Sequence, residues 1–251
     1  MRPPFTLNRI IMIEQQYAKR FTNVTQKPYG YLYWNEANKD CELSNHAIIT
    51  DFIGVEATLK DICFFYRQKD IFPRLFPALL ENELVELTPH LKQHGFELTM
   101  LNHAYYLWQN ESKVESVHGI YFERILQIND EVKELIRAEN YGEWTIKYLE
   151  RHIKNPGYHL IGGFVGEQMV AMGSISVFEG YSRIDDLITF QFYRNKGFSG
   201  TLLNYLIQHN KENTDNHLYF YAQYPDAAPL YEKAGFVLLP SLKTWRAVKT
   251  Y

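Results

Sequence analysis

The stretch that decides the fold joins a β-strand to an α-helix through a short turn that contains glycine. It reads Asp185-Asp186-Leu187-Ile188-Thr189-Phe190-Gln191-Phe192-Tyr193-Arg194-Asn195-Lys196-Gly197-Phe198-Ser199-Gly200-Thr201. Its apolar pattern predicts a strand over 182–192 and a helix that continues to about residue 208. Backbone N–H groups in the first turn of a helix have no intrahelical partner, and the helix dipole adds partial positive charge there. The stretch therefore predicts an anion site where the helix begins.

Small and basic residues line this turn in a way that suits a diphosphate. Gly197 and Gly200 have no Cβ atom to block the ligand, and Ser199 is nearly as small. Arg194 and Lys196 add positive charge at the rim. The stretch lacks the Gly-Lys-Ser/Thr of a nucleotide P-loop, the GxGxxG of a dinucleotide fold and the GxSxG of a serine hydrolase. Because glycine turns between strands and helices are common, an ordinary structural turn is the alternative for this segment alone.

A second stretch, further along the chain, strengthens the diphosphate interpretation. It reads Ala227-Ala228-Pro229-Leu230-Tyr231-Glu232-Lys233-Ala234-Gly235-Phe236. Together the two stretches resemble the GNAT N-acetyltransferase superfamily, over roughly residues 118–240. The family's cofactor motif, Arg/Gln-x-x-Gly-x-Gly/Ala, is matched by Arg194, Gly197 and Ser199, with serine where glycine or alanine is usual. Its later motif, Asn-x-x-Ala-x-x-Leu-Tyr-x-x-x-Gly-Phe, is matched by Ala227, Leu230, Tyr231, Gly235 and Phe236, with Tyr224 in place of the asparagine.

The resemblance implies a mixed sheet that is splayed open between its fourth and fifth strands, with acetyl-CoA in the opening. The fourth strand would then be 185–192. Its main chain would hold the acetyl and pantetheine groups at Leu187, Ile188 and Thr189. The diphosphate would bind the segment that follows, which comprises Arg194, Asn195, Lys196, Gly197, Phe198, Ser199, Gly200 and Thr201.

The resemblance also implies catalytic roles. Tyr231 falls where the family commonly has the general acid that protonates the departing thiolate, the alternative being that it only packs on the cofactor. A general base is expected at the start of the fourth strand, where Asp185 and Asp186 stand. Because successive strand residues face opposite sides of a sheet, at most one of them is expected to point into the cleft. Glu179 and Tyr221 are weaker choices, and the alternative is that both aspartates are merely solvated.

The length of 251 residues allows two domains of ordinary size. Residues 109–113 are polar and lack apolar periodicity, so we expect an N-terminal α/β domain over 1–116 and a catalytic domain over 117–251. Residues 90–98 repeat the helix-stop-strand order of residues 230–238, which favours a degenerate, cofactor-free copy of the same fold in the N-terminal half. The alternative is coincidence, because glycine followed by phenylalanine is a common way to end a helix.

Composition excludes several other classes of protein. The formal charge of −3 gives no basic excess for nucleic acid, and no run approaches the ~20 apolar residues that cross a bilayer. The start of the chain does not read as a secretion signal, so a cytoplasmic protein is expected. Cys41 and Cys63 form no CxxC pair, and His90 and His94 lack a third ligand, so neither a disulfide nor a metal site is expected.

The sequence therefore predicts an N-acetyltransferase of the α/β class in which a neutral primary amine attacks the thioester of acetyl-CoA directly. No cysteine lies in residues 117–251, which agrees with direct attack. The acceptor would be a small-molecule amine or a protein amine. Two alternatives are a non-catalytic acyl-CoA-binding sensor or regulatory module, and an interaction protein that binds no CoA. The sequence does not predict an oligomeric state.

Overall fold

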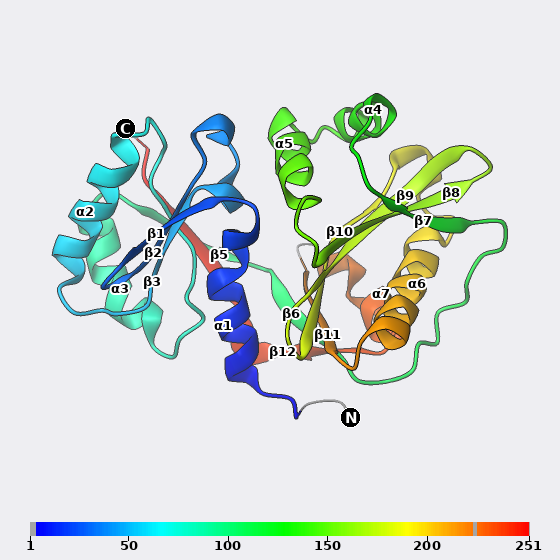
Figure 1. Cartoon of the computed structure of the whole chain (residues 1–251). Helices are drawn as coiled ribbons and strands as arrows, with labels where there is room; N and C mark the ends of the chain where they lie inside the picture. Colours follow the sequence, from blue (N-terminus) through cyan, green and yellow to red (C-terminus); the bar gives the residue numbers. More distant parts are fainter. Residues whose placement is uncertain (1–3, 223–224, 251) are drawn as a thin grey trace. The chain divides into compact units, whose positions relative to one another are not determined.

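The computed structural model describes residues 4–222 and 225–250 and divides the chain into two compact units. The C-terminal unit consists of residues 103–242 together with the short segment that precedes residue 6. The N-terminal unit consists of residues 6–102 together with the chain from residue 243 onward. Each unit has one sheet with helices on both faces (Figure 1).

The C-terminal unit follows the predicted order of elements, with one additional strand in front. It contains β6 (Ala104–Trp108), β7 (Tyr121–Ile125), α4 (Asp130–Ala138), α5 (Glu143–His152), β8 (Tyr158–Val165), β9 (Gln168–Val177), β10 (Tyr181–Thr189), η4 (Gln191–Tyr193), α6 (Phe198–Asn213), β11 (His217–Ala222), η5 (Pro225–Ala227), α7 (Ala228–Lys233), β12 (Phe236–Leu239) and η6 (Pro240–Leu242).

Local sequence explains why these elements begin and turn where they do. Asn129 caps α4, because its side-chain oxygen accepts the Val132 N–H over 3.0 Å. The predicted hairpin is also confirmed, since β8 and β9 pair from Tyr158–Ser176 to Val165–Gln168 around a turn at Gly166. Gly166 has a φ of 58°, a left-handed conformation that glycine adopts at little cost.

The seven strands of the C-terminal unit lie in the order β12-β6-β11-β10-β9-β8-β7. All neighbours are antiparallel except β10 and β11, which are parallel and pair only from Tyr181–His217 to Ile184–Phe220. Past Ile184 the two strands part. Residues 181–184 are buried and residues 185–189 are partly exposed, as expected where β10 loses its neighbour. The predicted splay between the fourth and fifth strands is therefore confirmed.

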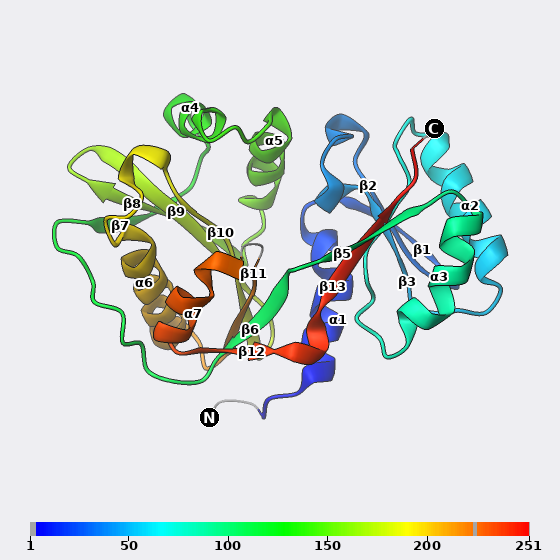
Figure 2. The ribbon, with the colours of Figure 1, turned by 180° about the vertical axis from the view of Figure 1, so that it is seen from behind.

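Helices α4 and α5 lie over one face of this sheet, and α6 and α7 lie over the other (Figures 1 and 2). His159 and Ile161 of β8 face α6, where His159 contacts His209 and Ile161 joins the core around Leu206. Tyr158, one residue before His159, faces the other way and stacks on His152 of α5. This alternation defines two faces, here called the α6 face and the α5 face.

The N-terminal unit is built from a similar series. Its elements are α1 (Leu7–Tyr17), η1 (Ala18–Arg20), β1 (Asn23–Lys27), β2 (Gly30–Trp34), η2 (Glu36–Asn38), η3 (Glu42–Ser44), β3 (His46–Ile49), α2 (Val55–Arg67), β4 (Arg74–Leu75), α3 (Glu83–Gln93), β5 (Glu97–Leu101) and, from the C-terminal end of the chain, β13 (Thr244–Val248). The β1–β2 hairpin and β13 have no counterpart in the sequence-based prediction, because the apolar pattern there is too short and irregular.

The two sheets share one topology. The N-terminal order β1-β2-β3-β4-β13-β5 has antiparallel neighbours everywhere except at the β3–β4 pair, which is parallel. The same sequence of directions runs through β8-β9-β10-β11-β6-β12 in the C-terminal unit. The helix ends also match, since Gly95 after α3 and Gly235 after α7 have φ values of 75° and 91°. The predicted likeness between the halves is confirmed at the level of the fold.

Each sheet takes one strand from the other half of the sequence. β6 follows β5 in the chain but lies between β11 and β12, whereas β13 follows β12 but lies between β4 and β5. The division in the structure therefore differs from the predicted boundary at 116/117. A polar linker does follow β6, at residues 109–113, but the strand before it belongs to the C-terminal sheet.

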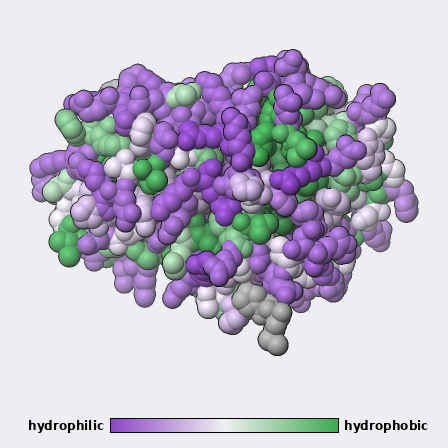
Figure 3. Space-filling model, viewed as in Figure 1, coloured by the Kyte–Doolittle hydropathy of each residue, from purple (hydrophilic) through white to green (hydrophobic). Residues whose placement is uncertain are grey.

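The surface agrees with the composition. On the face shown in Figure 3, most side chains are hydrophilic. They lie between smaller patches of hydrophobic side chains. In the part of the chain that the structure describes, no helix combines the length and the apolar character needed to span a bilayer.

Candidate functional site

A β-bulge in β10 marks the point where the sheet opens. β10 pairs with β9 through Asp185–Ser174 and again through Ile188–Met172, so Asp186 and Leu187 together oppose Gly173. Asp186 has a φ of 53°, in the left-handed region that few residues other than glycine adopt. Leu187 packs on the α6 face, where a Cβ atom placed on Gly173 would lie 3.2 Å from its Cδ1.

The bulge brings both sequence-predicted carboxylates to the α5 face. Asp186 Oδ2 accepts hydrogen bonds from Tyr158 Oη over 2.6 Å and from Ser174 Oγ over 2.8 Å. Asp185 forms an ion pair with Arg183, two residues earlier on the same face. The expectation that at most one aspartate points to this side is wrong, because the extra residue of the bulge interrupts the alternation of the strand.

Asp186 differs from Asp185 in its electrostatic environment. Burial, and then repulsion from Asp185, raises the pKa of Asp186 to about 7. The hydrogen bonds from Tyr158 and Ser174 and the charge of Arg183 oppose this shift. A carboxylate with a pKa near the working pH is suited to accept and release a proton, so Asp186 is the stronger candidate base.

Aromatic side chains complete the α5 face beside the opening. Tyr221 of β11 forms a short hydrogen bond with His103 Nδ1, and the Arg183 guanidinium lies over the Tyr221 ring, 5.9 Å from its centroid. Tyr105 of β6 also packs against Tyr221, at a centroid distance of 5.2 Å. Tyr221, a weaker candidate from the sequence, thus belongs to the same group. Glu179 lies in the turn between β9 and β10, at the opposite end of β10 from the bulge.

Sequence patterns did not identify four residues of this group, because none of them belongs to a motif: Arg183, Tyr158, Ser174 and His103. The only signal is their position. Arg183 stands two residues before Asp185 on a strand, and Ser174 lies opposite Asp185 across the hairpin.

Tyr231 lies on the other face. It is 8% exposed and packs against Phe220 and Tyr106, with ring centroids 4.5 and 5.5 Å away. Phe220 is the last residue of β11 that pairs with β10, so the Tyr231 ring is beside the point of splaying. Burial, and then Tyr106, raises the pKa of Tyr231 above that of an ordinary phenol, so Tyr231 is a proton donor and not a base at neutral pH. Tyr224, which replaces the asparagine of the family's later motif, lies outside the described residues.

The residues predicted to hold the cofactor follow one another along the chain from the opening to the start of α6, with the buried Phe190 between two accessible stretches. Leu187, Ile188 and Thr189 are partly exposed along the unpaired edge of β10. The turn after η4 exposes Arg194, Asn195, Lys196 and Gly197, and it contains two left-handed residues, Asn195 with a φ of 60° and Gly197 with a φ of 82°.

The start of α6 has the chemistry of an anion site. Gly197 is its N-cap, no described side chain caps the first turn, and no acidic residue lies there. Phe198 and Ser199 are partly exposed, whereas Gly200 and Thr201 are buried. The N–H groups of this turn therefore fit a diphosphate. The matching helix of the N-terminal unit, α2, also begins after a left-handed glycine, Gly54, but its first turn carries Glu56.

Arg194 has a partner within the protein. Its guanidinium donates to Glu139, at the C-cap of α4, and to the Thr189 carbonyl over 3.1 Å. Glu139 also accepts the Gln191 N–H, and its side chain is only 4% exposed. Arg194 therefore ties α4 to the turn, and with a side chain that is 53% exposed it also keeps a positive charge at the rim.

The glycines of the turn also serve a packing role. A Cβ atom on Gly197 would lie 2.8 Å from Val117 Cγ1, and one on Gly200 would lie 2.6 Å from Val114 Cγ1. The linker between β6 and β7 is held there by the Val117 N–H, which donates to Thr201 Oγ1 over 2.9 Å. The linker therefore fills the space that a Cβ atom on either glycine would occupy. The sequence alone suggests, in contrast, that this space is open to the ligand.

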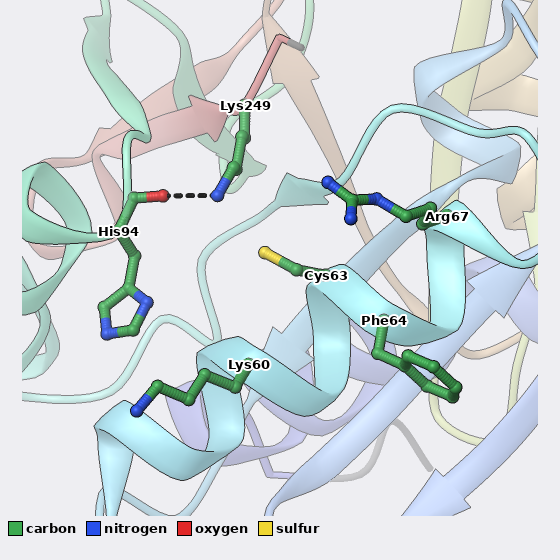
Figure 4. A pocket seen from close by; sticks show the side chains of 6 residues that line it. All are labelled: Lys60, Cys63, Phe64, Arg67, His94 and Lys249. Carbon is green, nitrogen blue, oxygen red and sulfur yellow. Dashed lines mark hydrogen bonds between the residues drawn. The ribbon is translucent and has the colours of Figure 1, made fainter.

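The N-terminal unit has a separate cavity of about 210 Å³ (Figure 4). Its lining consists of Lys60, Cys63, Phe64, Arg67, His94 and Lys249. Lys60 is paired with Glu56 over 2.6 Å, and the Lys249 ammonium donates to the His94 carbonyl over 2.8 Å, as the dashed line in Figure 4 shows. Local partners within the N-terminal unit thus engage both lysines of this cavity. Among the described residues, no group of three or more His, Cys, Asp or Glu is arranged to hold a metal ion.

Comparisons with known proteins identify a matching family model and several similar structures. The model of the acetyltransferase (GNAT) family matches residues 129–236. A GCN5-related N-acetyltransferase from Kribbella flavida has a similar structure, with a TM-score of 0.69 and 13% identity over 97% of this chain and 95% of that one. A functionally unknown conserved protein from Staphylococcus epidermidis gives a TM-score of 0.65 and 15% identity over 91% and 94% of the two chains.

A tandem GNAT protein from the clavulanic acid biosynthesis pathway also has a similar structure, with a TM-score of 0.55 and 12% identity over 82% of this chain and 76% of that one. At such identities these structures show a common fold. No curated protein matches the chain. The family match covers the bulge of β10, the start of α6 and Tyr231. Residues 129–236 are therefore similar in sequence to the acetyltransferase (GNAT) family, and the chain shares the fold of the GNAT structures named above.

Proposed function

We propose that the protein transfers an acetyl group from acetyl-CoA to a primary amine. The observation that carries this proposal is the splayed edge of β10, which a short turn joins to the uncapped start of α6. The diphosphate would be held by N–H groups of residues 195–201. The pantetheine arm would add to the unpaired edge of Leu187, Ile188 and Thr189. The thioester supplies the electrophilic carbonyl, and strand N–H groups would polarise it.

The two faces of the sheet would divide the proton transfers. Asp185 and Asp186 lie on the α5 face, whereas Tyr231 packs on the α6 face against Phe220. An amine that enters from the α5 face would lose its proton to Asp186. The thiolate would depart toward the α6 face and take a proton from Tyr231. Acid and base on opposite sides of the reacting carbonyl suit direct attack, with no covalent intermediate on the protein.

The acceptor would be an amine that arrives as a cation, whether it belongs to a small molecule or to a protein. The support is the pair of carboxylates beside the opening, with Tyr221 and Tyr105 next to them. A cation is attracted by the aspartates and by the faces of the aromatic rings. Loss of its proton to Asp186 would then produce the neutral nucleophile.

The test is a calorimetric titration with acetyl-CoA, followed by an assay of thiol release with a panel of primary amines. Binding together with amine-dependent release of CoA is the expected result. Binding without turnover for any amine would favour the non-catalytic acyl-CoA sensor. Failure to bind either acetyl-CoA or CoA would overturn the proposal and favour an interaction protein.

A further inference from the structure

The carboxylate of Asp186 is held by two hydroxyl groups that come from two different strands. Tyr158 stands at the start of β8, and Ser174 stands in the middle of β9. Both donate to the same oxygen, Oδ2, over 2.6 and 2.8 Å. Because both hydroxyl groups use Oδ2, Oδ1 is the oxygen that would receive the proton of an amine under the proposed function.

Tyr158 is itself immobilised by its surroundings. Its side chain is 1% exposed and stacks on the imidazole of His152, at a centroid distance of 3.8 Å and an interplanar angle of 15°. Its backbone N–H donates to the Asn155 carbonyl over 3.0 Å, and its carbonyl accepts from Arg124 over 3.2 Å. A donor that is fixed in this way holds its acceptor without losing further side-chain freedom.

The bulge makes such support necessary. Asp186 is in a left-handed conformation and interrupts the ladder between β9 and β10, so its side chain gains no orientation from regular pairing. The described titratable and charged groups that face it are Asp185 and Arg183 on β10, Tyr158 on β8 and, behind Tyr158, His152 on α5. Repulsion from Asp185 and burial favour the neutral acid, whereas donors to the carboxylate favour its ionised form.

We propose that Tyr158 is a positioning residue for acyl transfer: with Ser174 it holds Asp186 at the opening of the sheet and keeps the carboxylate able to accept the proton of the amine. This inference rests on the proposed function. The inference also gives α5 a part in positioning Asp186, because the ring of Tyr158 stacks on His152 of that helix.

The test compares Tyr158→Phe and Ser174→Ala with the wild type. Tyr158→Phe keeps the ring and its stack but removes the donor, and Ser174→Ala removes the second donor. The matched control is Tyr121→Phe, which removes a tyrosine hydroxyl that donates to the Gly166 carbonyl over 2.9 Å. Two quantities are measured as a function of pH: the rate of CoA release and the carbon-13 resonance of the Asp186 carboxyl, which is assigned with Asp186→Asn.

Loss of a donor to the ionised form is expected to move both midpoints upward by about one pH unit in Tyr158→Phe, with a smaller move in Ser174→Ala and none in Tyr121→Phe. If the titration midpoint of the Asp186 carboxyl resonance does not shift in Tyr158→Phe, the proposal is overturned, whatever the activity. A shift in the midpoint of the resonance without a shift in the pH profile of CoA release would also overturn the proposal, because Asp186 would then not act in the reaction. Absence of turnover in the wild type would instead count against the proposed function, and the resonance would still decide whether Tyr158 tunes Asp186.

Discussion

The ring of Tyr106 in β6 stacks on the ring of Phe220 in β11, with centroids 5.3 Å apart and planes inclined by 10°. The two residues also pair across the strands, although 114 positions separate them in the sequence. This contact shows that the C-terminal sheet is built around a strand that precedes the linker. Strand exchange between the halves is thus part of each core.

A fragment of residues 117–251 is therefore expected not to fold cooperatively. It lacks β6, which leaves β11 and β12 without the strand between them, and it carries β13 without its neighbours in the other sheet. A fragment of residues 103–242 keeps the whole C-terminal sheet and is expected to unfold in one transition. Circular dichroism during thermal and urea unfolding compares the two. A cooperative transition of the shorter fragment would contradict the structural division.

Replacement of Tyr231 by phenylalanine is expected to lower turnover by about 10²–10⁴-fold, the usual contribution of a general acid. The phenyl ring keeps the contacts with Phe220 and Tyr106, so the affinity for acetyl-CoA should change little. Steady-state rates and a calorimetric titration measure the two effects. Tyr121→Phe, which removes an exposed hydroxyl bonded to the Gly166 carbonyl, is the matched control. Full activity of Tyr231→Phe would restrict Tyr231 to a packing role.

Asp186 is expected to make stability depend on pH. Its pKa in the folded protein is about 7, above the ordinary value of 3.8, so the native state binds more protons than the unfolded chain between these values. The free energy of unfolding should therefore fall as pH rises from about 4 to about 7, and Asp186→Asn should remove this component. Urea unfolding of both proteins at pH 5 and pH 8 measures the difference. An identical pH dependence in the variant would show that Asp186 titrates normally.

The packing role of Gly200 predicts a specific rescue. Gly200→Ala places a methyl group 2.6 Å from Val114 Cγ1 and is expected to destabilise the protein by about 1–3 kcal/mol through overpacking. The double variant Gly200→Ala, Val114→Ala has room for the methyl group and should recover most of this loss. Urea unfolding measures stability, and calorimetry measures acetyl-CoA affinity in both variants. Recovery of stability without recovery of affinity would show that the glycine is also needed by the ligand.

The two thiols are expected to react differently in the native protein. Cys41 is 0% exposed, whereas Cys63 is partly exposed and lines the cavity of the N-terminal unit. Iodoacetamide should modify Cys63 alone in the native state and both residues in urea. Burial raises the pKa of Cys63, so its alkylation should need a higher pH than that of an ordinary thiol. Mass spectrometry counts the modified sites, and Cys63→Ser should leave the native protein unmodified.

Much of the site could be predicted because its signals are local. The turn from Arg194 to Gly197, the hairpin around Gly166 and the cap at Asn129 each depend on residues close together in the chain. Backbone conformation and helix caps are determined over a few residues, so they leave a pattern that can be read. The order of elements in the C-terminal half followed from the same signals.

Tertiary structure alone decided the rest. The exchange of β6 and β13, the contact of Glu139 with Arg194, and the hydrogen bond from Tyr158 to Asp186 join residues far apart in the chain. The bulge that turns Asp185 and Asp186 to one face depends on pairing with β9. Such contacts are selected by the packing of the whole sheet, which offers many alternative pairings to a short strand, so no local pattern encodes them. Residue patterns were thus enough to indicate the family resemblance and the place of the turn, whereas the folded sheet selected which side chains meet there.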